Sequence, residues 1–232
     1  MKTKAVLITG GTKRLGLELA IRTLEMGMAA IIHYRAEYHN AAYLQDKYKD
    51  RVFFIKADLS EKPEEIIDAA VALPIKLVGL VNNASVFTEG NLSDTYQFQT
   101  ILNVNTLAPV ILADRFSRIA DQGWIINITD ANVSSLNIRF MNYRISKLFL
   151  EEITRQQAFL YAPKIRVNAI APGAMLPSDK KEDSSFSSVS KKIPLGFTDD
   201  LQQLADTYTF LVENEYITGE TIRVDGGLHL NS

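Results

Sequence analysis

Short apolar runs that alternate with helical segments constrain the fold of this 232-residue chain more than any other feature. The apolar runs lie at residues 5–8, 29–34, 51–56, 77–81, 124–129, 165–170 and 221–224. Helical patterns follow the first run and recur at about 38–49, 61–72, 95–119, 142–162 and 199–213. Because the apolar runs are continuous, they are typical of strands that helices cover on both faces. The sequence therefore predicts an α/β fold, with one domain over residues 1–232 and a doubly wound, seven-stranded parallel sheet flanked by helices.

A glycine-rich turn, residues 9–16, follows the first apolar run and opens the first helix. A strand, such a turn and a helix start form the geometry that holds a pyrophosphate. Gly10 can adopt backbone angles closed to other residues, and Gly16 lets the helix pack close to the sheet. An ordinary strand-to-helix turn is the alternative, since a short glycine pattern does not decide by itself. Arg14 stands where many such loops carry their middle glycine.

Tyr143 and Lys147 are four residues apart on a predicted helix, so both side chains point to the same face. A free tyrosine has a pKa of about 10, and a neighbouring ammonium lowers it by stabilising the phenolate. The pair can therefore act as an acid near pH 7. The spacing is common by chance, and a solvated helix face is the alternative. Its significance comes from its place, one helix after the fifth strand.

Further motifs stand in a fixed order along the chain. They are Thr9-Gly10 with Gly16, Asp58, Asn82-Asn83-Ala84, Asn105, Tyr143 with Lys147, Pro172-Gly173, and Ile217-Thr218-Gly219 with Val224-Asp225-Gly226-Gly227. In this order the chain resembles the short-chain dehydrogenase/reductase family over essentially its full length. The resemblance implies a single-domain Rossmann fold, a nicotinamide cofactor and a homotetramer.

One position departs from that family. Most members place a serine thirteen residues before the catalytic tyrosine, and here that place is Asp130. An ionised carboxylate cannot donate a hydrogen bond to a ketone, but it can accept from the N–H groups of a nitrogen heterocycle. Thr129 is an unlikely stand-in because strand neighbours face opposite sides of a sheet. A backbone-capping aspartate at the strand end is the alternative for Asp130.

Three further places point in the same direction as Asp130: Arg14 in the loop, Ser85-Val86-Phe87 after the fourth strand, and His33-Tyr34-Arg35 after the second. With Asp130 they resemble the pteridine reductases, including the bacterial dihydromonapterin and dihydrofolate reductases. The resemblance implies a flat pterin held between the nicotinamide and an aromatic side chain. Phe87 matches that aromatic position, Ser85 the polar contact, and Arg14 the arginine near phosphate and substrate. A plain core phenylalanine is the alternative for Phe87.

The end of the second strand predicts NADPH as the cofactor. NAD enzymes place a carboxylate there for the ribose 2′-hydroxyl, whereas this chain offers His33, Tyr34 and Arg35, with Lys13 in the nearby loop. An arginine can bind a 2′-phosphate with two hydrogen bonds. For His33, a packing role at the strand end is the stronger interpretation.

The implied reaction is NADPH-dependent reduction of a C=N bond, which converts a dihydropterin of the dihydrobiopterin, dihydromonapterin or dihydrofolate type to its tetrahydro form. Tyr143 would protonate the ring nitrogen, and Lys147 would bind the nicotinamide ribose and lower the Tyr143 pKa. Asp130 would orient Tyr143 and the substrate, and Asn105 would hold a water that relays protons. The substrate-binding set is Arg14, Ser85, Phe87, Asp130 and Tyr143. The cofactor-binding set is Gly10, Lys13, Arg14, Leu15, His33, Tyr34, Arg35, Asp58, Leu59, Asn83, Ala84, Ser85, Tyr143, Lys147, Pro172 and Gly173.

Two alternative functions remain open at this point. One is an NADPH-dependent carbonyl reductase of the same family, acting for instance on 3-oxoacyl chains. The other is a non-catalytic NADPH-binding regulator, against which the intact pair of Tyr143 and Lys147 speaks.

Composition restricts the partners. A net charge of −2 argues against nucleic acid, and the absence of cysteine excludes disulfides and thiol catalysis. His33, His39 and His229 are scattered, so no metal site is expected. The first strand starts at once and no run reaches membrane-spanning length, so we expect a cytoplasmic protein without membrane contact. The serine-rich stretch 174–193 follows the sixth strand, and we expect it to cover the substrate as a lid, with disorder as the alternative.

Overall fold

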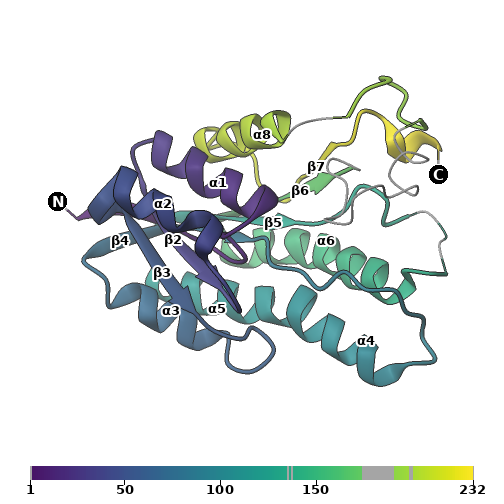
Figure 1. The fold of residues 1–232 in the computed structure, drawn as a ribbon, viewed down its shortest axis with the longest axis horizontal. Coiled ribbons are helices and arrows are strands. Elements are labelled where there is room, and N and C mark those ends of the chain that lie inside the picture. The colour runs from purple at the N-terminus through teal and green to yellow at the C-terminus, as the bar shows by residue number, and fades with distance from the viewer. Residues whose placement is uncertain (1, 135, 137, 174–190, 199–200, 232) are drawn as a thin grey trace.

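The computed structural model describes residues 2–134, 136, 138–173, 191–198 and 201–231 (Figure 1). Its centre is one sheet with the strand order β3-β2-β1-β4-β5-β6-β7, in which every pair is parallel. The strands are β1 (Thr3–Ile8), β2 (Ala29–Tyr34), β3 (Val52–Lys56), β4 (Ile75–Asn82), β5 (Gly123–Ile128), β6 (Ile165–Pro172) and β7 (Thr221–Val224). This is a Rossmann-type α/β fold, and the predicted fold class is confirmed.

Helices cover both faces of the sheet, as Figure 1 shows. They are α1 (Arg14–Glu25), α2 (His39–Tyr48), α3 (Glu64–Val71), α4 (Thr95–Leu102), α5 (Ala108–Ile119), α6 (Met141–Tyr161) and α8 (Gln202–Glu213), with short 3-10 turns at Lys49–Arg51 and Leu228–Asn231. None of the helices in the described ranges is long and apolar enough to cross a membrane.

Two apolar cores lie on opposite faces of the sheet. On one face Leu19 of α1, Leu44 of α2 and Tyr208 of α8 pack together, and all three side chains are fully buried. On the other face Ile67 of α3 and Phe116 of α5 are buried against the strands. Continuous apolar strands are explained by this double cover, since each strand needs apolar side chains on both of its faces.

The helix expected over 95–119 is interrupted. A π-helical turn, Asn103–Leu107, separates α4 from α5. Within it the Asn105 side chain exchanges two hydrogen bonds with the backbone of Val86, at 2.7 and 3.0 Å. Single π turns of this kind occur frequently at functional sites. Here the turn aims Asn105 at the loop that follows β4.

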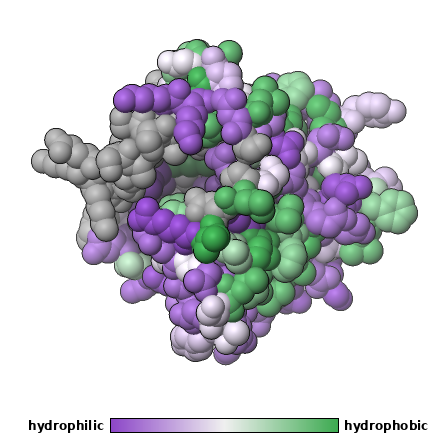
Figure 2. Space-filling view, turned by 90° about the vertical axis from the view of Figure 1, so that its right-hand side faces the viewer, coloured by the Kyte–Doolittle hydropathy of each residue, from purple (hydrophilic) through white to green (hydrophobic). Residues whose placement is uncertain are grey.

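The chain reverses its order in the sheet between β1 and β4. Ligands of doubly wound sheets bind outside the carboxyl ends of the strands at such a point. The right-hand side of Figure 1 holds these ends, and Figure 2 shows the same side face on. The sequence motifs of the predicted site lie in the segments that leave these strands.

Candidate active site

The turn between β1 and α1 has the close packing predicted for a phosphate loop. Gly10 adopts φ +63°, and a Cβ on Gly16 would lie 2.3 Å from the Gly10 carbonyl oxygen and 2.5 Å from Asn83 Nδ2. Asn83 Nδ2 donates to the carbonyls of Thr9 and Gly10 at 2.9 and 3.1 Å. The asparagine after β4 therefore holds the shape of the loop after β1.

Arg14 is the first residue of α1 and has φ +49°. This left-handed conformation favours glycine and costs a bulky residue about 1–2 kcal/mol. The Arg14 side chain is exposed. Such strain is found mainly where function requires the side chain. Arg14 thus stands where related loops carry their middle glycine, and it adopts the left-handed backbone conformation that favours glycine.

His33 lies beneath the same loop rather than facing a ligand. It is 2% exposed, its Nδ1 accepts from the Gly10 amide at 3.3 Å, and its Nε2 lies 3.2 Å from the Ala57 carbonyl. This arrangement requires the neutral ring, and burial lowers the pKa of His33. Both ring nitrogens are therefore used by the protein itself, in agreement with the packing role expected for His33, and a contact of His33 with the cofactor stays a prediction.

The segments after β2 and β3 carry the other predicted cofactor residues. Arg35 is exposed and Tyr34 is half-buried, with its ring centroid 5.2 Å from that of Tyr38. Asp58 Oδ1 accepts from the amide and the hydroxyl of Ser60 at 2.9 and 2.7 Å, and these hydrogen bonds lower the pKa of Asp58. Asp58 is therefore an ionised acceptor. Leu59 is buried in the core, so its side chain supports this segment from within.

Lys13 and Ser85 are exposed at this edge of the sheet, and Leu15 and Ala84 are half-buried beside the loop. The Pro172 carbonyl accepts from the Ala131 amide at 2.9 Å. This contact joins the ends of β5 and β6. The cradle of exposed cations and glycine-shaped backbone fits a phosphate-bearing dinucleotide.

The predicted catalytic residues come together at the end of β5. The Tyr143 hydroxyl donates to Asp130 Oδ2 at 3.0 Å, and Lys147 Nζ donates to the Ile128 carbonyl at 2.6 Å. Tyr143 and Lys147 are buried. Asp130 Oδ1 also accepts from the Asn132 amide at 2.7 Å, so the alternative role as a backbone cap is present as well. One aspartate performs both tasks because its two oxygens have different partners.

One prediction for this group is wrong in direction. Burial and the negative charge of Asp130 raise the pKa of Tyr143 well above its ordinary value of 10. Lys147 is itself desolvated, and burial lowers its pKa to about 8. The Arg144 guanidinium lowers the Tyr143 pKa, but burial and Asp130 outweigh it. The spacing of Tyr143 and Lys147 does not reveal this burial. Tyr143 is accordingly a protonated hydroxyl in this structure.

Asn105 does not reach the cluster as a free side chain. Besides Val86, it contacts Ser146, to whose Oγ its Nδ2 donates at 3.0 Å. The Ser146 hydroxyl in turn donates to the Tyr143 carbonyl at 2.6 Å. The water relay remains a prediction, while the observed role of Asn105 is to connect the segment after β4 with α6. Sequence reasoning missed Ser146, although its place directly before Lys147 was visible.

Phe87 forms an aromatic group with two partners. Its ring stacks on Phe140 at a centroid distance of 4.6 Å and meets the edge of Tyr143 at 4.7 Å. Phe87 is 60% exposed, which rules out the alternative of a core residue. Figure 2 shows apolar surface gathered on this face of the molecule. Sequence reasoning missed Phe140, for which the only available signal was an aromatic residue three positions before Tyr143.

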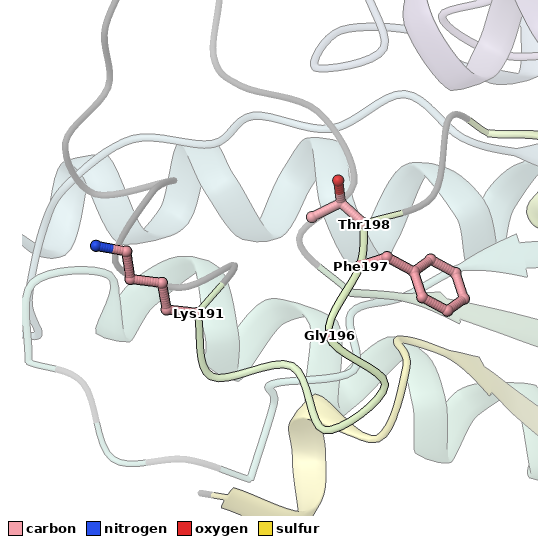
Figure 3. A pocket seen from close by; sticks show the side chains of 4 residues that line it. All are labelled: Lys191, Gly196, Phe197 and Thr198. Atoms are coloured by element: carbon pink, nitrogen blue, oxygen red, sulfur yellow. The ribbon is translucent and has the colours of Figure 1, made fainter.

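A second feature of this edge is an open pocket of about 400 Å³ (Figure 3). It is lined by Lys191, Gly196, Phe197 and Thr198. Residues 174–190 of the predicted lid lie outside the described residues. Ile193, the last residue of the predicted lid, is buried and packs against Gly226. A Cβ added to Gly226 would lie 2.5 Å from Ile193 Cγ2.

The fold and the cluster of Asp130, Tyr143 and Lys147 define a member of the short-chain dehydrogenase/reductase family, a class of nicotinamide-dependent oxidoreductases. Residues 11–229 match the family model described as enoyl-(acyl carrier protein) reductase, and the chain belongs to this family. A dihydromonapterin reductase from an Enterobacter species is 29% identical over 98% of this chain and 98% of its own length. A 3beta-hydroxysteroid dehydrogenase 1 from Eggerthella lenta is 29% identical over 99% of this chain and 95% of its own. The structure of FolM alternative dihydrofolate reductase 1 from Brucella suis in complex with NADP superimposes with a TM-score of 0.91, at 33% identity and with 97% and 95% of the two chains covered.

Proposed function

We propose that the chain catalyses NADPH-dependent reduction of a dihydropterin, of the dihydrobiopterin, dihydromonapterin or dihydrofolate type, to the tetrahydro form. The observation that carries this proposal is the hydrogen bond from Tyr143 to Asp130 beside the exposed ring of Phe87. A carboxylate in place of the usual serine cannot donate to a carbonyl oxygen, but it can accept from an N–H group. Phe87 offers a flat apolar surface to a flat heterocycle.

NADPH is the cofactor, as the NADP-bound Brucella relative and the basic edge of the site both support. Lys13, Arg14 and Arg35 are the exposed cations that would contact its phosphates, and Gly10, Asn83 and Gly173 would line it. Asp58, as an ionised acceptor, would bind the adenine amino group. When bound, NADPH supplies the hydride for the carbon of the substrate's C=N bond.

The chain's own residues handle the proton. The Tyr143 hydroxyl donates its proton to the ring nitrogen of the reduced bond, so one hydride and one proton complete the reduction. Asp130 orients the hydroxyl by accepting from it, while its negative charge raises the pKa of Tyr143 and so opposes early loss of the proton. Lys147, fixed on the Ile128 carbonyl, lies on the same helix face and would hold the nicotinamide ribose.

The test is a substrate panel followed by absorbance at 340 nm. With NADPH we expect turnover of dihydrobiopterin, dihydromonapterin or dihydrofolate, and at least tenfold weaker kcat/KM with NADH. Turnover of 3-oxoacyl or steroid ketones without any turnover of these pterins would overturn the proposal. A carbonyl reductase is the second candidate, because the Eggerthella relative is named as a hydroxysteroid dehydrogenase, an enzyme of alcohol and ketone chemistry.

We also propose a homotetramer in the cytoplasm. α5 and α6 expose large apolar side chains: Leu107 before α5, Ile111, Phe149, Phe159 and Leu160. Apolar surface of this kind on helices is typical of subunit contacts. Light scattering coupled to gel filtration tests the assembly. A mass of four chains is expected, and the mass of a single chain at micromolar concentration would contradict it.

A further inference from the structure

Arg144 is a buried arginine beside the two proton-active groups of the site. It directly follows Tyr143 on α6 and is 8% exposed. Its Nη2 donates to the backbone carbonyl of Asn132. Burying a guanidinium is costly because the cation loses its hydration, so it is retained where a negative group offsets the cost. Neither the motifs nor the proposed reaction uses this residue.

Asn132 connects Arg144 to Asp130 through its own backbone. Its amide donates to Asp130 Oδ1 at 2.7 Å, and its carbonyl accepts from Arg144. The second oxygen of Asp130 accepts from Tyr143 at 3.0 Å. A single turn after β5 therefore connects a cation, through the Asn132 backbone, to the carboxylate that orients the proton donor.

Four charged or titratable groups act on one another here, namely Asp130, Tyr143, Arg144 and Lys147. Burial raises the pKa of Asp130, while the hydrogen bonds from the Asn132 amide and the Tyr143 hydroxyl lower it, and the charges of Lys147 and Arg144 lower it further. Lys147 has a pKa of about 8 and therefore loses part of its charge near neutrality. Burial also lowers the pKa of Arg144, but a guanidinium remains charged at every pH at which the enzyme would work. Arg144 is thus the permanent cation of the group.

We propose that Arg144 is a positioning residue that keeps the Asp130 carboxylate ionised and so keeps it an acceptor for the Tyr143 hydroxyl. Arg144 acts through Asp130 and the Asn132 turn and does not touch the substrate. It thereby sets the lower pH limit of the reaction. This inference rests on the proposed function, because Asp130 and Tyr143 carry the proton step there.

The test compares variants that keep or remove the charge. Arg144→Gln and Arg144→Met remove the positive charge, and Arg144→Lys keeps a positive charge on a different side chain. In the neutral variants we expect the acid limb of the kcat/KM profile with NADPH and a dihydropterin to move to higher pH by about one unit, as for loss of a nearby opposite charge. In Arg144→Lys the limb stays near that of the wild type. Equal movement in all three variants, or none in any, would mean that Arg144 is only structural.

A second measurement needs no substrate. With ¹³C-labelled aspartate, NMR follows the titration of the Asp130 carboxyl, which is assigned by its loss in Asp130→Asn. The midpoint should lie higher in either neutral variant than in the wild type. An unchanged midpoint overturns the inference even if pterins are reduced. A raised midpoint in a protein that reduces no pterin overturns the proposed function and leaves the role of Arg144 standing.

Discussion

Two regions of the site are built differently. At the carboxyl ends of β1 and β4, side chains and glycines hold the backbone of a loop in a fixed conformation. At the end of β5, ionisable side chains are buried. In the first region Asn83, His33 and Gly16 fix a loop that carries the exposed cations Lys13 and Arg14. In the second region Asp130 and Tyr143 hold each other. We therefore expect cofactor recognition to depend on the conformation of the loop after β1. The proton step should depend on the burial of Asp130 and Tyr143. Substitutions should affect the two regions in different ways.

The largest effect is expected in the buried region. Tyr143→Phe removes the hydroxyl that we propose as the proton donor and should lower kcat by about 10³-fold, within the range for loss of a general acid. NADPH affinity should be retained, because the loop after β1 is untouched. Steady-state rates and a fluorescence titration with NADPH measure the two quantities. A variant that retains most of its turnover would show that the proton comes from elsewhere.

Asp130→Ser should exchange the substrate class. The hydroxyl can donate to a carbonyl oxygen, which the carboxylate cannot do. We expect kcat/KM for dihydropterins to fall by about 10²-fold, as for loss of a charge-assisted contact made in the transition state, and ketone reduction to appear. Asp130→Asn is the matched control, with the same shape and no charge. Undiminished pterin reduction in the serine variant would separate Asp130 from substrate choice.

Arg14→Gly should separate stability from cofactor binding. Relief of φ +49° is worth about 1–2 kcal/mol, and glycine loses up to about 1 kcal/mol of it through the unfolded chain, so the melting temperature should rise slightly. The KM for NADPH should rise about tenfold, the value of one charged contact. Arg14→Ala is the control, which loses the cation but keeps the strain. If kinetics with NADPH and pterin are unchanged, the assignment of Arg14 fails.

The smallest effect concerns His33 and pH. Its pKa is lowered from 6.5 by burial, so the unfolded chain binds the proton more readily than the folded one. This contribution to stability is present above pH 6.5 and is lost as the pH falls below that value toward the folded-state pKa. His33→Asn can still accept from Gly10 but does not titrate. Its melting temperature should therefore fall less between pH 7 and pH 5 than that of the wild type, and equal slopes would contradict this role of His33.

The sequence predicts the loop after β1 better than it predicts the buried cluster at the end of β5. Gly10, Gly16 and the order of the motifs indicate the loop, and continuous apolar runs indicate a doubly covered sheet. The spacing from Tyr143 identifies Asp130. The π turn at Asn103–Leu107 escapes such reasoning because it depends on a tertiary contact between Asn105 and Val86.

The missed residues of the buried region have a common physical cause. Phe140 becomes significant only when it stacks on Phe87 of the segment after β4, and Arg144 only when α6 packs against the segment after β5. Neither residue belongs to a motif. The prediction that the Tyr143 pKa is lowered is wrong for the same reason. Spacing along a helix identifies the neighbouring residue but not how deeply the pair is buried. Residue spacing in a sequence therefore identifies the reactive side chains more readily than the burial that sets their pKa values.

The fate of the hydride tests the central claim most directly. The enzyme is supplied with NADPH that carries deuterium on the reactive face of the nicotinamide, together with a dihydropterin and a 3-oxoacyl ketone in equal amounts. Mass spectrometry of the products should find one deuterium on the ring carbon of a tetrahydropterin and none in an alcohol. Deuterium in the alcohol, with the pterin unlabelled, would contradict the account.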